Sequence, residues 1–275
     1  MRLGYIATAA SAAVYLALCG LMYFAQRRLT YFPDTNRVAP ADMGLGSVGE
    51  ITFATPGGEK ILAWYAKAKP GQPTLLYFHG NGGSLASRAE RIRKYAALGR
   101  GVFMMTYRGY GGSTGEPSEA ANIADAKLAY DTLVKAGVAG TDIILYGESL
   151  GSGVAVQVAA EKQAAGLVLD APYTRLVDVA AGRYPWVPVR LLMRDRYDSA
   201  RYLPDLKLPL LIVHGDQDQT VPVEMGRRVF ELAGGPKEIA ILKGAGHNDH
   251  FKFGSFEAVN DWIDRLRAGR AGSGR

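Results

Sequence analysis

The stretch from Ile143 to Ala160, IILYGESLGSGVAVQVAA, constrains the fold of this chain more than any other. It opens with a short apolar run typical of a β-strand and ends in an alanine-rich segment compatible with a helix. Between them, Gly147–Gly151 reads GESLG and fits the G-x-S-x-G nucleophile elbow, in which the glycines allow a turn too tight for a Cβ atom. The pattern predicts an exposed Ser149 at a strand-to-helix turn, although a Gly/Ser turn of any doubly wound protein gives the same five residues.

The rest of the chain alternates apolar segments with helix-compatible ones. Strands are expected at 51–55, 61–66, 74–78, 101–107, 143–146, 167–170, 210–214 and 239–242, and helices at 84–98, 118–136, 223–233 and 256–266. The first two strands, separated by PGGE, indicate an antiparallel hairpin. The later alternation predicts an α/β fold with a mainly parallel sheet, helices on both faces and ligands at the carboxyl ends of the strands.

The composition fits one globular domain. The 275 residues are 48% hydrophobic and 21% charged, which argues against disorder. The net charge of +6 comes from scattered Lys and Arg residues without a nucleic-acid-binding signature, so no nucleic-acid partner is expected. The single cysteine, Cys19, excludes an intramolecular disulfide.

The N-terminal segment 3–25 carries no charged residue and is long enough to cross a bilayer, so it is predicted to be a transmembrane anchor. A cleaved signal peptide is the alternative, but the apolar run is longer than the usual one. Arg2 precedes the segment and Arg27-Arg28 follow it, which favours a cytoplasmic catalytic domain only slightly and leaves the topology open.

Four further regions complete the expected organisation. Residues 26–50, rich in Pro, Gly and Asp, are expected to form a linker, and residues 51–267 the α/β domain. The alternation lapses over 173–209, where aromatic and aliphatic residues favour a short cap over the site. Residues 268–275 are expected to be a disordered tail. Tyr107, Tyr173 and Trp186 are candidate substrate contacts.

Several polar or glycine-rich loops follow the predicted strands. The loop HGNGG, residues 79–83, lacks both the G-x-G-x-x-G pattern and the lysine of a phosphate-binding loop, and it is better suited to lend a backbone N–H to an oxyanion hole. Asp218 and His247 lie in loops after the last two strands. With Ser149 they come in the order Ser, Asp, His, which is the order in α/β hydrolases.

On these motifs the chain resembles the α/β-hydrolase superfamily and, within it, the membrane-anchored serine hydrolases of the Bem46 and alpha/beta-hydrolase-domain-13 type. The resemblance covers about 31–266 and rests on LTYFP, HGNGG, YRGYG, GESLG, DQTVP and GHN. It implies Ser149 as nucleophile, Asp218 as acid and His247 as base.

The resemblance also implies an oxyanion hole, made by the backbone N–H groups of Leu150 and of Asn81 or Gly82. Asp216 and His250 are the competing acid and base, although the G-x-x-D-x-x-V-P spacing favours Asp218. No metal-ligand spacing is evident, so neither a metal nor a cofactor is expected.

The expected activity is hydrolysis of carboxylic esters or thioesters through an acyl-enzyme. The anchor and the apolar cap favour a lipid-like acyl substrate met at a membrane. Two alternatives remain: a serine peptidase of the prolyl oligopeptidase type, and a non-catalytic membrane-anchored binding protein. The triad leaves the leaving group and the oligomeric state open.

Overall fold

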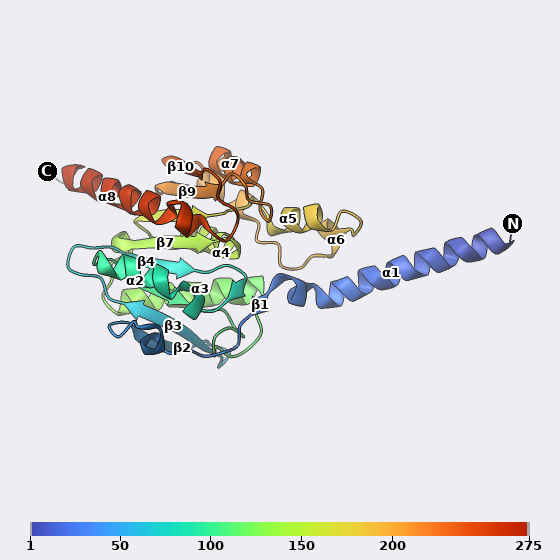
Figure 1. Ribbon diagram of the computed structural model, residues 1–275, viewed down its shortest axis with the longest axis horizontal. Helices are drawn as coiled ribbons and strands as arrows, with labels where there is room; N and C mark the ends of the chain where they lie inside the picture. Colours follow the sequence, from blue (N-terminus) through green and yellow to red (C-terminus); the bar gives the residue numbers. More distant parts are fainter. Residues whose placement is uncertain (1, 274–275) are drawn as a thin grey trace.

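The computed structural model describes residues 2–273, which build one eight-stranded sheet with helices on both faces (Figure 1). The strands are β2 (Gly49–Ala54), β3 (Lys60–Ala66), β4 (Thr74–Phe78), β6 (Gly101–Met105), β7 (Ile143–Glu148), β8 (Gly166–Asp170), β9 (Leu210–Gly215) and β10 (Lys237–Leu242), in the order β10-β9-β8-β7-β4-β6-β3-β2. Pairing is parallel from β10 to β6, whereas β3 runs antiparallel to both β6 and β2. The predicted α/β class and the N-terminal hairpin are confirmed.

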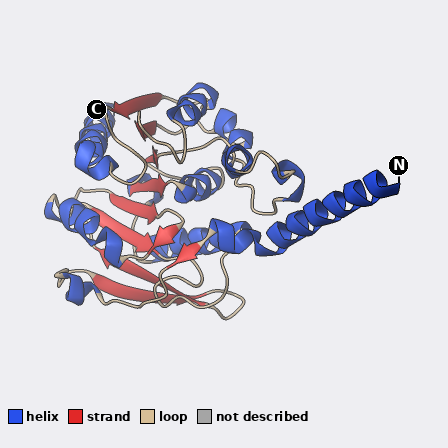
Figure 2. Ribbon diagram, turned by 45° about the vertical axis from the view of Figure 1, so that its right-hand side comes forward, coloured by secondary structure: helices blue, strands red, loops and turns tan. Residues whose placement is uncertain are grey.

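Two layers of helices enclose the sheet (Figure 2). Helices α2 (Ala89–Ala97) and α8 (Ser255–Ser273) cover one face, and α3 (Glu119–Lys135), α4 (Leu150–Ala159) and α7 (Val223–Leu232) cover the other. The period of two along a strand explains why both faces are apolar. In β4, Leu75 and Tyr77 pack on the α2/α8 side, whereas Leu76 and Phe78 pack on the α3/α4 side.

The strand order reverses at β4, and this reversal positions the site. From β4 the chain passes through α2 to β6 on one side, and then through α3 to β7 on the other side of β4. Helices that leave neighbouring strands on opposite faces open a crevice at the carboxyl ends of those strands. The loop 79–83 follows β4 and Ser149 follows β7, so both lie at this crevice.

The N-terminal helix is longer than predicted. Helix α1 (Arg2–Thr30) includes the first five residues of the expected linker, and it is long and apolar enough to cross a membrane. After it, β1 (Phe32–Pro33) pairs in parallel with β5 (Gly82–Gly83), which belongs to the loop after β4. The expected linker therefore contains a strand that is part of the domain.

The region predicted as a cap contains α5 (Leu176–Arg183), α6 (Val189–Leu192) and two short 3-10 helices, η4 (Ser199–Arg201) and η5 (Leu203–Asp205). It packs beside the C-terminal part of α1, where Cys19 is buried against Val177, Val187 and Val189. Figures 1 and 2 show α5 and α6 projecting from the body of the domain on the same side as α1. Four other 3-10 helices lie in loops: η1 (Pro40–Met43), η2 (Ala86–Arg88), η3 (Gly140–Asp142) and η6 (His250–Phe253).

The C-terminal end differs from the expectation. Helix α8 extends to Ser273, so residues 268–273 are helical in the structure instead of forming a disordered tail. Residues 274–275 of that predicted tail lie outside the described residues. Ala268, Arg270 and Ala271 favour a helix, and no proline interrupts residues 268–273.

Candidate active site

Ser149 stands at the turn between β7 and α4 in a backbone conformation that L-residues rarely adopt, with φ 50° and ψ −114°. The residues two positions before and after it must be glycine. A Cβ on Gly147 would lie 2.4 Å from the carbonyl oxygen of Gly151, and a Cβ on Gly151 would lie 2.0 Å from that of Phe78. The Ser149 backbone N–H donates to the carbonyl of Asp170, at 2.8 Å. The elbow is thus held between two strands, and its strain is of the kind found at functional sites.

Three side chains from separate loops form a continuous chain of hydrogen bonds. The distance from Ser149 Oγ to His247 Nε2 is 2.9 Å, and the distance from His247 Nδ1 to Asp218 Oδ2 is 2.7 Å. Because an ionised carboxylate can only accept, Nδ1 carries the proton and Nε2 is left to accept from Ser149. The structure therefore brings together the predicted nucleophile, base and acid in the tautomer that proton transfer requires.

The loop after β9 fixes the carboxylate of Asp218. Its Oδ1 accepts from the backbone N–H groups of Thr220 and Val221, at 2.8 and 2.9 Å. Burial alone would raise the pKa of Asp218, but the contacts with His214 and His247 and the backbone hydrogen bond lower it below its usual range. Asp218 is therefore ionised and fixed in orientation at neutral pH.

The competing acid and base are engaged elsewhere. Asp216 Oδ1 accepts from the Gly244 backbone N–H at 2.7 Å. His250 is buried, with Nδ1 2.5 Å from Asp170 Oδ1, and its Nε2 accepts from the Gly215 backbone N–H at 3.0 Å. Both ring nitrogens of His250 are committed, so this imidazole braces the start of the Asp218 loop and cannot receive a proton from Ser149 without losing a bond.

The remaining two histidines are buried in the domain. His79 Nδ1 donates to the carbonyl of Gly80 at 2.6 Å, and burial lowers the pKa of His79 to about 3. His214 Nε2 donates to the carbonyl of Val221 at 2.8 Å and lies 3.4 Å from Asp218 Oδ2. Both rings support the loops that carry the site. Among the described residues, His, Cys, Asp and Glu form no group of three or more that could hold a metal ion.

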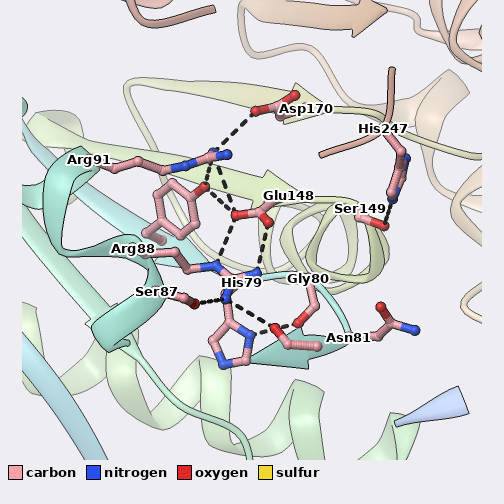
Figure 3. Close-up of polar contacts among 12 residues, drawn as sticks. His79, Gly80, Asn81, Ser87, Arg88, Arg91, Glu148, Ser149, Asp170 and His247 are labelled. Atoms are coloured by element: carbon pink, nitrogen blue, oxygen red, sulfur yellow. Dashed lines mark hydrogen bonds and ion pairs between the residues drawn. The ribbon is translucent and has the colours of Figure 1, made fainter. Parts of the chain in front are cut away.

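The loop after β4 passes on the other side of Ser149 from His247 (Figure 3). Its approach is close, since a Cβ on Gly80 would lie 3.5 Å from Ser149 Cβ. Hydrogen bonds hold both the backbone and the side chain of Asn81. Its backbone carbonyl accepts from the Phe32 N–H at 2.9 Å and from Tyr110 Oη at 2.7 Å, and its side-chain Nδ2 donates to the Thr30 carbonyl at 2.8 Å. This leaves the loop rigid beside the N-terminus of α4, whose first N–H groups, including that of Leu150, lack intrahelical acceptors.

A network of ion pairs lies beside the nucleophile and was not anticipated from the sequence. Glu148 accepts two hydrogen bonds from Arg88, at 2.8 and 3.1 Å, and a third from Tyr77 Oη at 2.6 Å. Arg91 lies 3.5 Å from both Glu148 and Asp170 (Figure 3). Burial alone would raise the pKa of Glu148, but the two arginines lower it well below its usual range.

These groups line a cavity of about 460 Å³ that opens beside Ser149. Its walls combine the glycine-rich loop, both arginines, both carboxylates and two histidines. They include Asn81, Gly82, Arg88, Arg91, Glu148 and Asp170. The cavity next to the reactive hydroxyl is therefore polar and charged.

The three candidate substrate contacts lie outside this cavity. Tyr107 and Tyr173 are buried, and their hydroxyls donate to the backbone carbonyls of His79 and Leu150, at 2.8 and 3.0 Å. They support the loop after β4 and the start of α4 from below. Trp186 lies in the cap loop beside α1, where it is half exposed. Position after a strand brought the first two near the site, but their side chains point into the core.

Fold and site together define an α/β hydrolase: a switch-point crevice, a serine at a strained elbow and a Ser-His-Asp hydrogen-bonded chain. The family model described as Hydrolase_4, serine aminopeptidase, S33, matches residues 69–196. An esterase of Pyrococcus furiosus has the same fold, with a TM-score of 0.70 at 20% identity over 86% of this chain and 97% of that one.

Two curated relatives cover most of the chain. Protein bem46 of Schizosaccharomyces pombe is 30% identical over 92% of this chain and 91% of its own length. Protein Rv2307c of Mycobacterium tuberculosis is 37% identical over 86% of this chain and 87% of its own length. The chain belongs to the Bem46-like family of α/β hydrolases.

Proposed function

We propose that this protein is a serine hydrolase that cleaves carboxylic ester or thioester bonds. The observation that carries the proposal is the unbroken hydrogen-bonded chain from Ser149 Oγ through His247 to an ionised Asp218. Such a chain activates a hydroxyl that is otherwise a weak nucleophile at neutral pH.

The reaction follows from these positions. His247 Nε2 takes the proton of Ser149 as Oγ attacks the substrate carbonyl, and the oxyanion accepts from the backbone N–H of Leu150 and of Asn81 or Gly82. His247 then gives the proton to the leaving alcohol or thiol, and the acyl group stays on Oγ. Water, deprotonated by His247, releases the acid and restores the serine.

The charged cavity bears on the substrate. Arg88, Arg91, Glu148 and Asp170 are paired with one another, so they offer a polar wall of nearly balanced charge. We propose that a polar part of the substrate occupies this cavity. A lipid-like ester fits this arrangement with its headgroup side in the cavity, and α1 as a membrane anchor would bring the enzyme to such a substrate.

Hydrolysis of p-nitrophenyl esters from acetate to palmitate tests the proposal, with detergent-solubilised protein and its Ser149→Ala variant compared side by side. We expect activity in the first and none above the buffer rate in the second. Equal rates in both, or none in either, would contradict the proposal and favour a binding role. A strict preference for acetate would exclude the lipid-like substrate while leaving the hydrolase intact.

A peptidase is the second candidate, favoured by the description of the matching family model. An aminopeptidase needs an anion to hold the α-ammonium group of its substrate. Both carboxylates that line the cavity already have cationic partners, because Glu148 pairs with Arg88 and Asp170 contacts Arg91. This pairing favours the ester; release of free amine from a peptide substrate would reverse the preference.

A further inference from the structure

The cap is attached to α1 well inside the apolar part of that helix. Tyr15 Oη donates to the carbonyl of Trp186 at 3.0 Å, and Cys19 is buried against Val187 and Val189. These contacts join residues 183–191, the cap turn between α5 and α6, to the middle of α1.

A second set of contacts secures the same pairing nearer the end of the helix. The Arg194 backbone N–H donates to Gln26 Oε1 at 2.7 Å, and the Arg194 guanidinium lies over the ring of Tyr23, 4.4 Å from its centre. Arg27 pairs with Asp195 at 3.3 Å. The cap thus lies along α1 from Tyr15 to Arg27 and cannot be distant from whatever surrounds that helix.

The length of α1 places the cap turn in the membrane. Leu3 to Tyr15 spans only about 18 Å of helix axis at about 1.5 Å per residue. The hydrocarbon core is about 30 Å thick, and tilting shortens the thickness that a helix covers. If α1 spans the bilayer, as the proposed anchor requires, residues beyond Tyr15 must lie within the membrane, and the Trp186 turn lies beside them.

The outer surface of the cap turn suits such a place. Trp186 is 52% exposed and Leu191 is 78% exposed. Pro185 and Pro188 flank the tryptophan and have no N–H to desolvate, and the carbonyl of Trp186 is already bonded to Tyr15.

Charge indicates the kind of lipid. Arg183 and Arg190 are exposed in this turn. Arg190 pairs with Asp178, which leaves the turn with an excess of positive charge. Long basic side chains extend from the apolar layer to the interface, where they attract anionic headgroups at about 1 kcal/mol each.

We propose that the cap turn, residues 183–191, inserts beside α1 into the domain-side leaflet of a bilayer that contains anionic lipids. The inference rests on the membrane anchor in the proposed function but is independent of the hydrolytic chemistry. It makes the cap a second membrane contact beside α1, and it gives the domain a fixed orientation toward the surface.

Tryptophan fluorescence tests this directly, because Trp64 and Trp262 are buried in the domain at 1% and 3% exposure. The full chain is placed in vesicles of phosphatidylcholine and phosphatidylglycerol whose acyl chains are brominated near the middle of their length. We expect loss of Trp186 fluorescence, absent in the Trp186→Phe variant. Fluorescence that bromine leaves unchanged and aqueous iodide quenches would overturn the inference.

Two further arms separate the possible failures. Resistance to alkaline carbonate extraction establishes that α1 is integrated; protein that is extracted overturns the anchor itself and the inference with it. In vesicles of phosphatidylcholine alone, and in the Leu191→Glu variant, we expect weaker bromine quenching. Equal quenching in the neutral vesicles would overturn the assignment of anionic headgroups.

Discussion

The backbone N–H of Phe32 donates a 2.9 Å hydrogen bond to the carbonyl of Asn81 and so ties the segment that leaves α1 to the loop beside Ser149. Asn81 directly precedes β5, whose Gly82 is the residue paired with Phe32 of β1. The loop proposed to stabilise the oxyanion is therefore held from the side of the N-terminal helix.

Removal of the second donor to the same carbonyl tests the importance of this support. Tyr110→Phe deletes the 2.7 Å bond to Asn81 and keeps the buried ring. We expect kcat for a p-nitrophenyl ester to fall about tenfold, a loss of roughly 1.4 kcal/mol of transition-state stabilisation, with KM unchanged. Tyr130→Phe is the matched control, because its hydroxyl bonds the Gln163 carbonyl at 2.6 Å outside the site. Equal losses of kcat in both variants would contradict a specific role.

The acid of the triad can be separated from its neighbour by a pair of variants. Asp218→Asn should lower kcat by about 10⁴-fold, because an amide no longer holds the imidazole in the tautomer that accepts from Ser149. Asp216→Asn should change kcat little, because the Asp216 side chain accepts from the Gly244 N–H and makes no hydrogen bond to His247 within residues 2–273. A large loss in the second variant and a small one in the first would exchange the two assignments.

Strain at the elbow predicts that glycine at position 149 gives a more stable protein than alanine. Glycine tolerates φ 50°, whereas alanine does not, so Ser149→Gly should exceed Ser149→Ala in free energy of unfolding by about 1 kcal/mol. Both variants should lack esterase activity. Urea unfolding followed by circular dichroism measures the difference; a glycine variant less stable than the alanine variant would show that the turn is not strained.

The ion pair behind the nucleophile should be important for stability. Glu148→Gln leaves Arg88 buried without its carboxylate, and we expect a loss of about 3 kcal/mol in the free energy of unfolding. Glu238→Gln, which breaks an exposed pair with Arg265, should cost less than about 1 kcal/mol. A comparable loss in the two variants would mean that the pair near Ser149 is effectively solvated.

The depressed pKa of Glu148 gives this loss a dependence on pH. Burial opposes ionisation, but Arg88 and Arg91 keep the folded-state pKa well below the unfolded value of about 4.3. The stabilising contribution is therefore complete above about pH 4.3 and is lost as the pH falls toward the folded-state pKa. The difference in unfolding free energy between wild type and Glu148→Gln should narrow below about pH 4; a difference that widens there would refute the assignment.

Sequence motifs were sufficient to predict the residues that follow strands, because parallel strands bring their carboxyl ends to one edge of the sheet. Ser149, Asp218 and His247 were predicted in this way, and the structure places them within hydrogen-bonding distance. The same argument fails for side-chain direction. Tyr107 also follows a strand, yet its ring turns into the core and its hydroxyl bonds the His79 carbonyl.

Partners that depend on tertiary approach left little signal in the sequence. Glu148 occupies a variable position of the elbow motif, and its partner Arg88 is 60 residues away. The two-residue strands β1 and β5 are too short for a hydrophobic pattern, and only backbone bonds define them. Two arginines three residues apart at the start of a helix, facing the elbow, are the one feature that could have indicated the network.

Cys19 gives the contact between α1 and the cap an unusual practical value. It is the single cysteine of the chain and is 7% exposed beneath Val177, Val187 and Val189. In the detergent-solubilised protein a thiol reagent consequently has one target, and the cap valines cover that target. The rate at which Cys19 is labelled therefore reports how often the cap separates from α1, without an introduced probe.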